Sequence, residues 1–210
     1  MADTVGIANP LKFASLVQYV KSLGPVEVGV HAHNDFGMAT TNSLAALDAG
    51  ADWADATILG LGERAGNARL EELASYFTLQ REKGYKLATL KDLAVKVAHM
   101  SGRQIEPHKP IIGERIFYCE TGLHFQGLNK DTSTYELFSP ETVGAKRKLQ
   151  FGSKIGRKEI LNCLGGMKVN RADFNLDELV RSVRRKAEAI GRPLKKIELL
   201  SMLTSMFSAQ

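Results

Sequence analysis

Two histidines separated by one residue follow an apolar, β-branched run, and they are the clearest candidates for chemistry. Val28 and Val30 lead directly into His31 and His33. Because successive side chains of a strand point to opposite faces, both imidazoles are predicted to lie on the same face. Two imidazoles at one strand end can hold a divalent metal ion, and the alternative is a pair of hydrogen-bonded loop histidines.

A second polar loop follows the next apolar run and favours the metal interpretation. Residues 56–61 lead into the sequence Gly-Glu-Arg-Ala-Gly-Asn, which ends at Asn67. This loop is predicted to bring the Asn67 side chain to the same end of the sheet as a further polar ligand. Glu63 and Arg64 are expected to pair with each other and shape the loop, without a catalytic role.

Helical and strand patterns alternate through the first 84 residues. Asn9 and Pro10 form a typical helix start. The Asn9 side chain is the predicted cap, and Pro10 is the first residue of the helix. The apolar stripe of this first helix is expected to include Leu11, Ala14, Leu16, Val17, Val20 and Leu23. The predicted order is helix 10–23, strand 25–30, a helix from Asp35 or Thr40 to residue 50, strand 53–59 and helix 67–84. Such alternation indicates βαβ units and a parallel sheet.

The pattern changes after Gly84. Thr89 and Asp92 resemble a capping box at the start of another helix. Residues 103–153 are rich in glycine, proline and polar residues, and helical patterns return at 156–164, 176–190 and 194–207. We therefore predict three segments: a partial barrel at 1–86, an irregular subdomain at 87–153 and a helical subdomain at 154–210.

The predicted sheet is too small to be complete. Parallel strands are normally buried on both faces and paired on both edges. Two full strands and three helices would leave edges and apolar helix faces uncovered. We therefore expect either a fragment or a chain whose remaining strands come from another polypeptide, and we expect the isolated chain to expose a wide apolar face.

Composition excludes several other classes of protein. The 210 residues carry a net charge of +5, and the excess is scattered without the basic, aromatic-interleaved patch of a nucleic-acid binder. A mild positive charge suits anionic substrates. Cys119 and Cys163 form no Cys-x-x-Cys motif, so neither a disulfide framework nor a thiolate zinc site is indicated. No signal peptide or membrane-spanning run is recognisable, so a cytoplasmic location is expected.

Short motifs in a fixed order support a resemblance to a known family. They are ADTVG at 2–6, HAHNDFG at 31–37, GLGERAGN at 60–67, SGR at 101–103, TGLH at 121–124, TYE at 134–136 and PETVG at 140–144. The chain resembles the homocitrate and isopropylmalate synthases, which are acyl-CoA-condensing TIM-barrel metalloenzymes, and it looks most like the nitrogenase-associated homocitrate synthases. The resemblance implies the C-terminal part of a (β/α)8 barrel, about strands six to eight, followed by a mostly helical subdomain.

The resemblance also implies roles for individual residues. His31 and His33 correspond to metal ligands for Mg, Mn or Zn, with Asn67 as a nearby or weaker ligand. The opening barrel strand, which would bring an Asp ligand and an Arg that steadies the developing oxyanion, is missing. A partner chain carrying the N-terminal barrel strands is therefore implied, within an oligomer.

Three further residues correspond to the substrate and proton-transfer sites of the family. Thr4 matches the threonine that holds the carboxylate of the 2-oxo acid, although it could also cap a turn. His124 matches an acid or base of the helical subdomain, and Tyr135 matches the tyrosine beside it. From the residues alone, His124 has the less favoured alternative of a buried hydrogen-bonded histidine, and Tyr135 could equally be a core residue. His99 and His108 have no matching role.

The implied reaction is a Claisen condensation of acetyl-CoA with a 2-oxo acid. A metal would polarise the ketone, and a base would remove a proton from the acetyl methyl group. The first expectation is homocitrate synthesis from 2-oxoglutarate. The alternatives are isopropylmalate, citramalate or Re-type citrate synthesis, or a non-catalytic homologue that modulates a complete synthase. The loop at 60–67 lacks the cysteine of the related lyases, and residues 151–157 (FGSKIGR) depart from the GKHSGR that many synthases carry.

Overall fold

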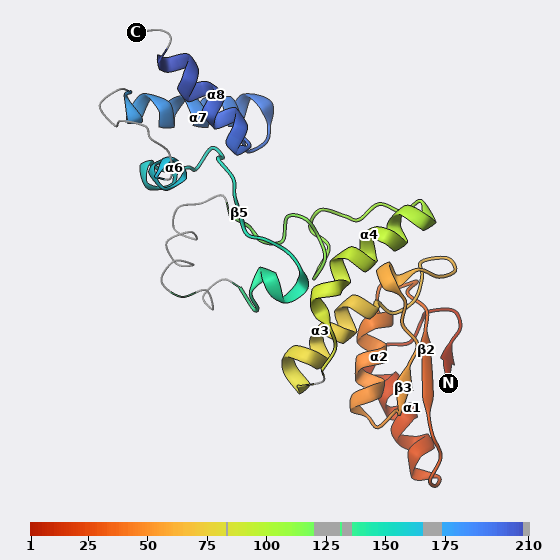
Figure 1. Cartoon of the computed structure of the whole chain (residues 1–210). Coiled ribbons are helices and arrows are strands. Elements are labelled where there is room, and N and C mark those ends of the chain that lie inside the picture. Colours follow the sequence, from red (N-terminus) through yellow and green to blue (C-terminus); the bar gives the residue numbers. More distant parts are fainter. Residues whose placement is uncertain (83, 120–130, 132–135, 166–173, 208–210) are drawn as a thin grey trace. The chain divides into compact units, whose positions relative to one another are not determined.

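The computed structural model describes residues 1–82, 84–119, 131, 136–165 and 174–207. Its internal contacts divide the chain into two compact units. Unit 1 contains residues 1–116 and 141–145, and unit 2 contains residues 117–140 and 146–210 (Figure 1). His124 and Tyr135, the two predicted residues of the helical subdomain, lie outside the described residues.

Unit 1 is an α/β structure built on three parallel strands. The sheet order is β1-β2-β3, with both pairs parallel. The predicted α/β class with a parallel sheet is therefore confirmed. Its elements in chain order are β1 (Ala2–Asp3), α1 (Pro10–Ser22), β2 (Gly29–Ala32), α2 (Ala39–Asp48), β3 (Trp53–Ala54), the short 3₁₀ helix η1 (Ile58–Gly60), α3 (Leu70–Arg81), η2 (Leu87–Thr89), α4 (Leu90–Ser101) and η4 (Pro140–Val143).

The two faces of this sheet differ. Val28, Val30 and Ala32 point to one face and are at most 4% exposed. They form a core with Phe13 and Val17 of α1, and with buried alanines of α2. The alternate residues of β2, including His31, point to the other face and stay partly exposed. The packing of α1 and α2 on one face thus leaves the histidine face open for a site.

Local chemistry explains where some elements begin and end. The Asn9 side chain caps α1 by accepting a hydrogen bond from the backbone nitrogen of Lys12 at 3.0 Å, as predicted. The capping box predicted at Thr89 is wrong, because its hydroxyl donates to the carbonyl of Lys86 at 2.8 Å. The strand predicted at 53–59 is also too long: β3 has two residues, and the chain turns at Leu59, where φ is 61°.

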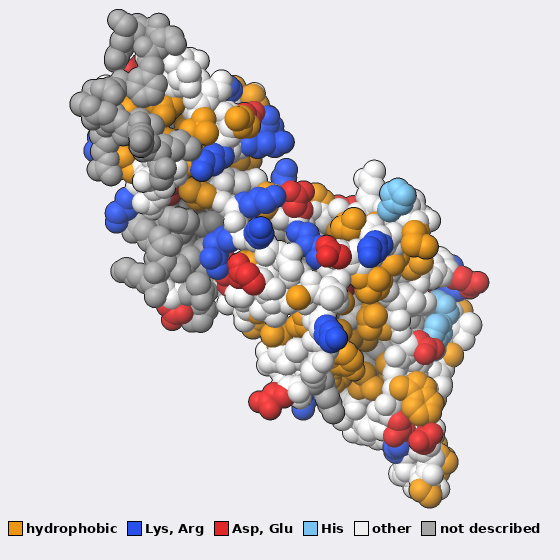
Figure 2. Space-filling model, viewed as in Figure 1, with side chains coloured by type: hydrophobic (Ala, Val, Ile, Leu, Met, Phe, Trp, Pro, Cys, Tyr) orange, Lys and Arg blue, Asp and Glu red, His pale blue; other side chains and the backbone are white. Residues whose placement is uncertain are grey.

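The apolar stripe predicted for α1 is only partly correct. Leu11, Leu16 and Leu23 were expected to face inward, but they are 81%, 50% and 67% exposed. Val17 of the predicted stripe is buried, and Phe13, which the predicted stripe did not include, is buried in the same core. Figure 2 shows hydrophobic side chains, in orange, on the surface of this part of the chain. The outer side of α1 is thus an apolar surface without a neighbour among the described residues.

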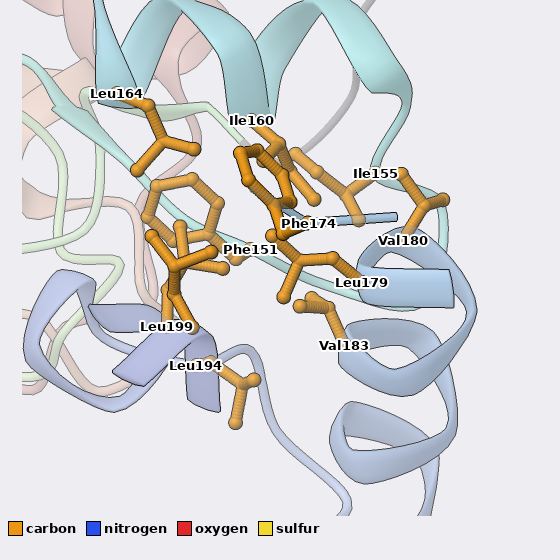
Figure 3. Close-up of a cluster of buried hydrophobic side chains, with 11 residues drawn as sticks. Phe151, Ile155, Ile160, Leu164, Phe174, Leu179, Val180, Val183, Leu194 and Leu199 are labelled. Carbon is orange, nitrogen blue, oxygen red and sulfur yellow. The ribbon is translucent and has the colours of Figure 1, made fainter. Parts of the chain in front are cut away.

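Unit 2 is mostly helical, as the resemblance implies. The strands β4 (Tyr118–Cys119) and β5 (Lys148–Leu149) pair in parallel, and three helices follow: α6 (Arg157–Leu164), α7 (Leu176–Ile190) and α8 (Lys196–Phe207). All three lie close to the predicted ranges. Figure 3 shows their shared core, made of Phe151, Ile155, Ile160, Leu164, Phe174, Leu179, Val180, Val183, Leu194, Leu199 and Leu203.

Among the described helices, none is both long enough and apolar enough to cross a membrane.

Candidate metal centre

The two histidines of the β2 end lie side by side. His31 is within β2 and His33 follows it, so the strand alternation brings both side chains to the open face of the sheet. Their ring centroids are 4.7 Å apart, with the ring planes at 84°. This edge-to-face arrangement gives two imidazoles that a single ion can contact.

Each imidazole is held through the same ring nitrogen. The Nδ1 of His31 lies 3.1 Å from Oδ2 of Asp55, and the Nδ1 of His33 lies 3.3 Å from the carbonyl oxygen of Asp3. Because a carbonyl oxygen and a carboxylate only accept, Nδ1 must carry the proton in both rings. Among the described residues, neither Nε2 has a hydrogen-bond partner. Metal-binding histidines typically use one nitrogen for the ion and donate the other to a carboxylate or carbonyl.

Asn67 lies next to His33, as the sequence predicts. The two residues form an isolated antiparallel bridge, and the backbone nitrogen of Asn34 donates to the carbonyl of Gly66 at 2.8 Å. Directly opposed residues in an antiparallel pair share a face. The Asn67 Nδ2 donates to the carbonyl of Leu61 at 3.3 Å, but its Oδ1 is buried and has no hydrogen-bond partner within the described structure.

This orphaned oxygen provides a test of whether a metal fits. A buried polar atom without a partner is costly, and a cation would satisfy it. Two imidazole nitrogens and one amide oxygen match the donor types that Zn and Mn accept, and Mg binds mainly through oxygen. The described residues contain no group of three or more His, Cys, Asp and Glu side chains suited to hold a metal. The residues present therefore fit one part of a metal site.

Arg64 ties the loops around the histidines together. Its guanidinium donates two hydrogen bonds to the Asp35 carboxylate, at 2.9 and 3.0 Å, and one to the carbonyl oxygen of Thr4 at 2.8 Å. These bonds lower the pKa of Asp35 below its usual value. The predicted pairing with Glu63 is therefore wrong. Asp35, and not Glu63, is the partner of Arg64. Gly6, at a φ of 68° and without a Cβ, leaves room for the Asp35 carboxylate next to the Gly6 backbone.

Thr4 does not cap the turn that follows β1, which was the alternative role left open for it. The buried Asp3 carboxylate caps that turn instead, because it accepts from the backbone nitrogens of Ile7 and Ala8 at 3.1 and 3.0 Å. Thr4 is exposed at the end of β1, one residue past the strand. Its hydroxyl has no partner among the described residues and is available to an anion.

Asp55 is the residue that reasoning from the sequence missed. Gly29 pairs with Trp53 in the parallel register, so Asp55, two residues further along, lies beside His31. The side chain of Asp55 is 65% exposed and that of His31 is 35% exposed. The alternation along residues 53–55 places Trp53 and Asp55 on the same face. Only the register of β3 against β2, which the sequence does not give, shows that the Asp55 carboxylate meets His31.

Comparison with known proteins identifies the family of the chain. Residues 1–97 match the HMGL-like family, and residues 111–190 match the family described as homocitrate synthase post-HMGL domain-like. The chain is 38% identical over 202 residues to a protein named 2-isopropylmalate synthase 2 from Caldanaerobacter subterraneus subsp. tengcongensis, covering 94% of this chain and 52% of that protein.

Two further relatives carry different names. Homocitrate synthase 1 from Nostoc sp. is 38% identical, with 96% of this chain and 54% of the relative covered. The (R)-citramalate synthase CimA of Methanocaldococcus jannaschii is 35% identical, with 97% and 42% covered. The chain thus spans about half the length of the curated relatives it matches. It belongs to the family of homocitrate and 2-isopropylmalate synthases, with part of an HMGL-like TIM barrel followed by the post-HMGL domain.

Proposed function

We propose that this chain carries part of the active site of a synthase that condenses acetyl-CoA with a 2-oxo acid, with 2-oxoglutarate as the substrate and homocitrate as the product. One observation carries the proposal. Among the described residues, His31 and His33 share an open face, each is fixed through Nδ1 with Nε2 free, and Asn67, which bridges to His33, has a buried side-chain oxygen without a hydrogen-bond partner. This arrangement is suited to a divalent ion, Mg, Mn or Zn.

When bound, such an ion supplies Lewis acidity toward the ketone of the 2-oxo acid. The chain's own residues then have distinct tasks. His31 and His33 hold the ion, and Asn67 offers an oxygen next to it. The exposed hydroxyl of Thr4, at the end of the neighbouring strand, donates to the carboxylate of the 2-oxo acid. By their match to the family motifs, His124 moves the proton of the acetyl methyl group and Tyr135 assists it.

A partner chain that supplies the remaining barrel strands is part of the proposal. Within the described residues β1 pairs only with β2, so its second edge is free to accept another strand. The outer side of α1 exposes Leu11, Tyr19 and Leu23, which are 81%, 62% and 67% exposed. A free strand edge beside an apolar helix face suits a further strand and helix of a parallel α/β unit.

Reconstitution tests this proposal. The full chain is combined with a polypeptide carrying the N-terminal half of an HMGL-like barrel, and free coenzyme A is measured with a thiol reagent in the presence of Mn²⁺ or Mg²⁺. We expect release that depends on both acetyl-CoA and 2-oxoglutarate and that is lost in His33→Ala. Asp48→Asn, which breaks a surface pair with Arg81, is the matched control and should keep the activity.

A panel of 2-oxo acids distinguishes homocitrate synthesis from its alternatives. The names of the relatives make 2-oxoisovalerate and pyruvate the first competitors of 2-oxoglutarate. A preference for either would replace the homocitrate proposal by isopropylmalate or citramalate synthesis. A folded complex with no turnover on any of them would contradict the enzymatic proposal and favour a modulating role.

A further inference from the structure

Glu71, in the first turn of α3, is a buried carboxylate that the proposed chemistry does not use. Its side chain is 0% exposed, and its Oε2 accepts a hydrogen bond from the backbone nitrogen of Leu59 at 3.0 Å. The Nζ of Lys109 lies 3.6 Å from Oε1, and the Lys109 side chain is only 12% exposed. A buried carboxylate needs such partners, because an uncompensated charge is strongly unfavourable there.

The contact with Leu59 falls on a strained position of the loop. Leu59 has a φ of 61° and a ψ of 9°, a left-handed conformation that its Cβ disfavours. Gly60, also left-handed, accepts a hydrogen bond from the backbone nitrogen of Asn67 at 3.1 Å. The carboxylate of Glu71 therefore holds the backbone nitrogen of Leu59, and the carbonyl of the next residue, Gly60, holds the backbone of Asn67.

Lys109 reaches Glu71 from a tight turn. Its backbone nitrogen donates to the carbonyl of Glu106 at 3.0 Å, and its carbonyl accepts from Gly113 at 2.9 Å. A Cβ at Gly113 would lie 2.6 Å from the backbone nitrogen and oxygen of Lys109, so the turn closes only around a glycine. Ile112, 2% exposed, anchors the same turn in the interior. The ammonium group is thus aimed at the carboxylate by rigid backbone.

We propose that Glu71 is a positioning residue for the loop that carries Asn67, and that Lys109 couples the segment 106–113 to that loop. Lys109 places a cation 3.6 Å from Oε1 of Glu71, while Oε2 accepts from the backbone nitrogen of Leu59. Without Lys109, the buried carboxylate loses the one cation that the described structure places beside it, and its hold on Leu59 weakens. The role of Glu71 and Lys109 in metal binding rests on the proposed function, whereas their hold on Leu59 does not.

Amide hydrogen exchange of Leu59 in the full chain directly tests the hydrogen bond from Leu59 to Glu71 and its support by Lys109, which together we call the clamp. Glu71→Leu removes the acceptor, and we expect the Leu59 amide to exchange about tenfold faster or more. Lys109→Met should also speed exchange, because it leaves the charge unpaired. Glu71→Gln keeps an acceptor oxygen, so the double variant Glu71→Gln/Lys109→Met should return exchange to within about threefold of the wild type. Glu72→Gln, on the same turn but paired with Arg69, is the matched control.

Binding of Zn²⁺ alone, measured by calorimetry on the same proteins, tests the positioning role. We expect roughly tenfold weaker binding in Glu71→Leu and Lys109→Met, near wild-type binding in the double variant, and unchanged circular dichroism. Unchanged exchange at Leu59 in Lys109→Met would overturn the clamp. Faster exchange with unchanged Zn²⁺ affinity would overturn the positioning role. A wild-type chain that binds no Zn²⁺ would contradict the proposed metal site, whereas the exchange experiment would still decide the clamp.

Discussion

The hydrogen bond between Asp55 and His31 gives the most direct prediction about the metal centre. Asp55 accepts from Nδ1 of His31 at 3.1 Å, which fixes the tautomer and leaves Nε2 as the nitrogen available to the proposed metal ion. Loss of such a supporting partner typically weakens metal binding about 10- to 100-fold. Because Asp55 is 65% exposed, water can replace part of the bond, so we expect the lower end, about tenfold, for Asp55→Ala.

Two measurements on the full chain check this prediction. Zn²⁺ titration gives the affinity, and ¹⁵N chemical shifts of the His31 ring give the tautomer without any metal. Asp55→Asn keeps an acceptor oxygen but no charge, so its affinity should fall by about threefold, between wild type and Asp55→Ala. Asp48→Asn, a surface carboxylate paired with Arg81, is the control and should leave both readouts unchanged. A His31 ring that keeps its Nδ1–H tautomer and full Zn²⁺ affinity in Asp55→Ala would refute the reasoning.

Three further predictions concern the loop, its pH dependence and the helical unit. Gly66→Ala should weaken Zn²⁺ binding in a titration, because φ is 96° and the new Cβ would lie 2.0 Å from the carbonyl oxygen of Gly60; wild-type affinity would contradict this. Arg64 lowers the pKa of Asp35, so their bond adds stability that is fully present above the ordinary carboxyl pKa and is lost as pH falls through the lowered value. The protection factors of the loop amides, which are the intrinsic exchange rates at each pH divided by the observed rates, should therefore fall below about pH 4 in the wild type but stay constant in Asp35→Asn. Phe151→Ala, in a core where Phe151 is 1% exposed, should destabilise unit 2 by about 3–5 kcal/mol in denaturant unfolding.

Periodicity and local capping predicted much of the secondary structure. The Asn9 cap and the helices of unit 2 follow from short-range patterns, and the structure agrees with both. The buried face of β2 follows from the alternation of Val28 and Val30. These features depend on residues a few positions apart, which is the range over which a sequence pattern carries information.

Features that depend on contacts across the sheet were missed or mispredicted. Asp55 meets His31 across 24 positions, and Arg64 meets Asp35 across 29, so neither pairing has a local signature. The prediction for the three exposed leucines of α1 failed for a related reason. Leu11 and Leu23 have the spacing of core residues, yet no described element covers them.

The geometry of the candidate metal centre is set by its neighbours more than by its ligands. His33 is oriented by the carbonyl of Asp3 on β1, His31 by Asp55 just past β3, and the Asn67 loop by Glu71 on α3. The three supports come from three separate elements that only the parallel register brings together. A shift of either strand pair by one residue would turn its support to the opposite face. The motif thus names the candidate ligands, whereas their positions depend on the fold of unit 1 as a whole.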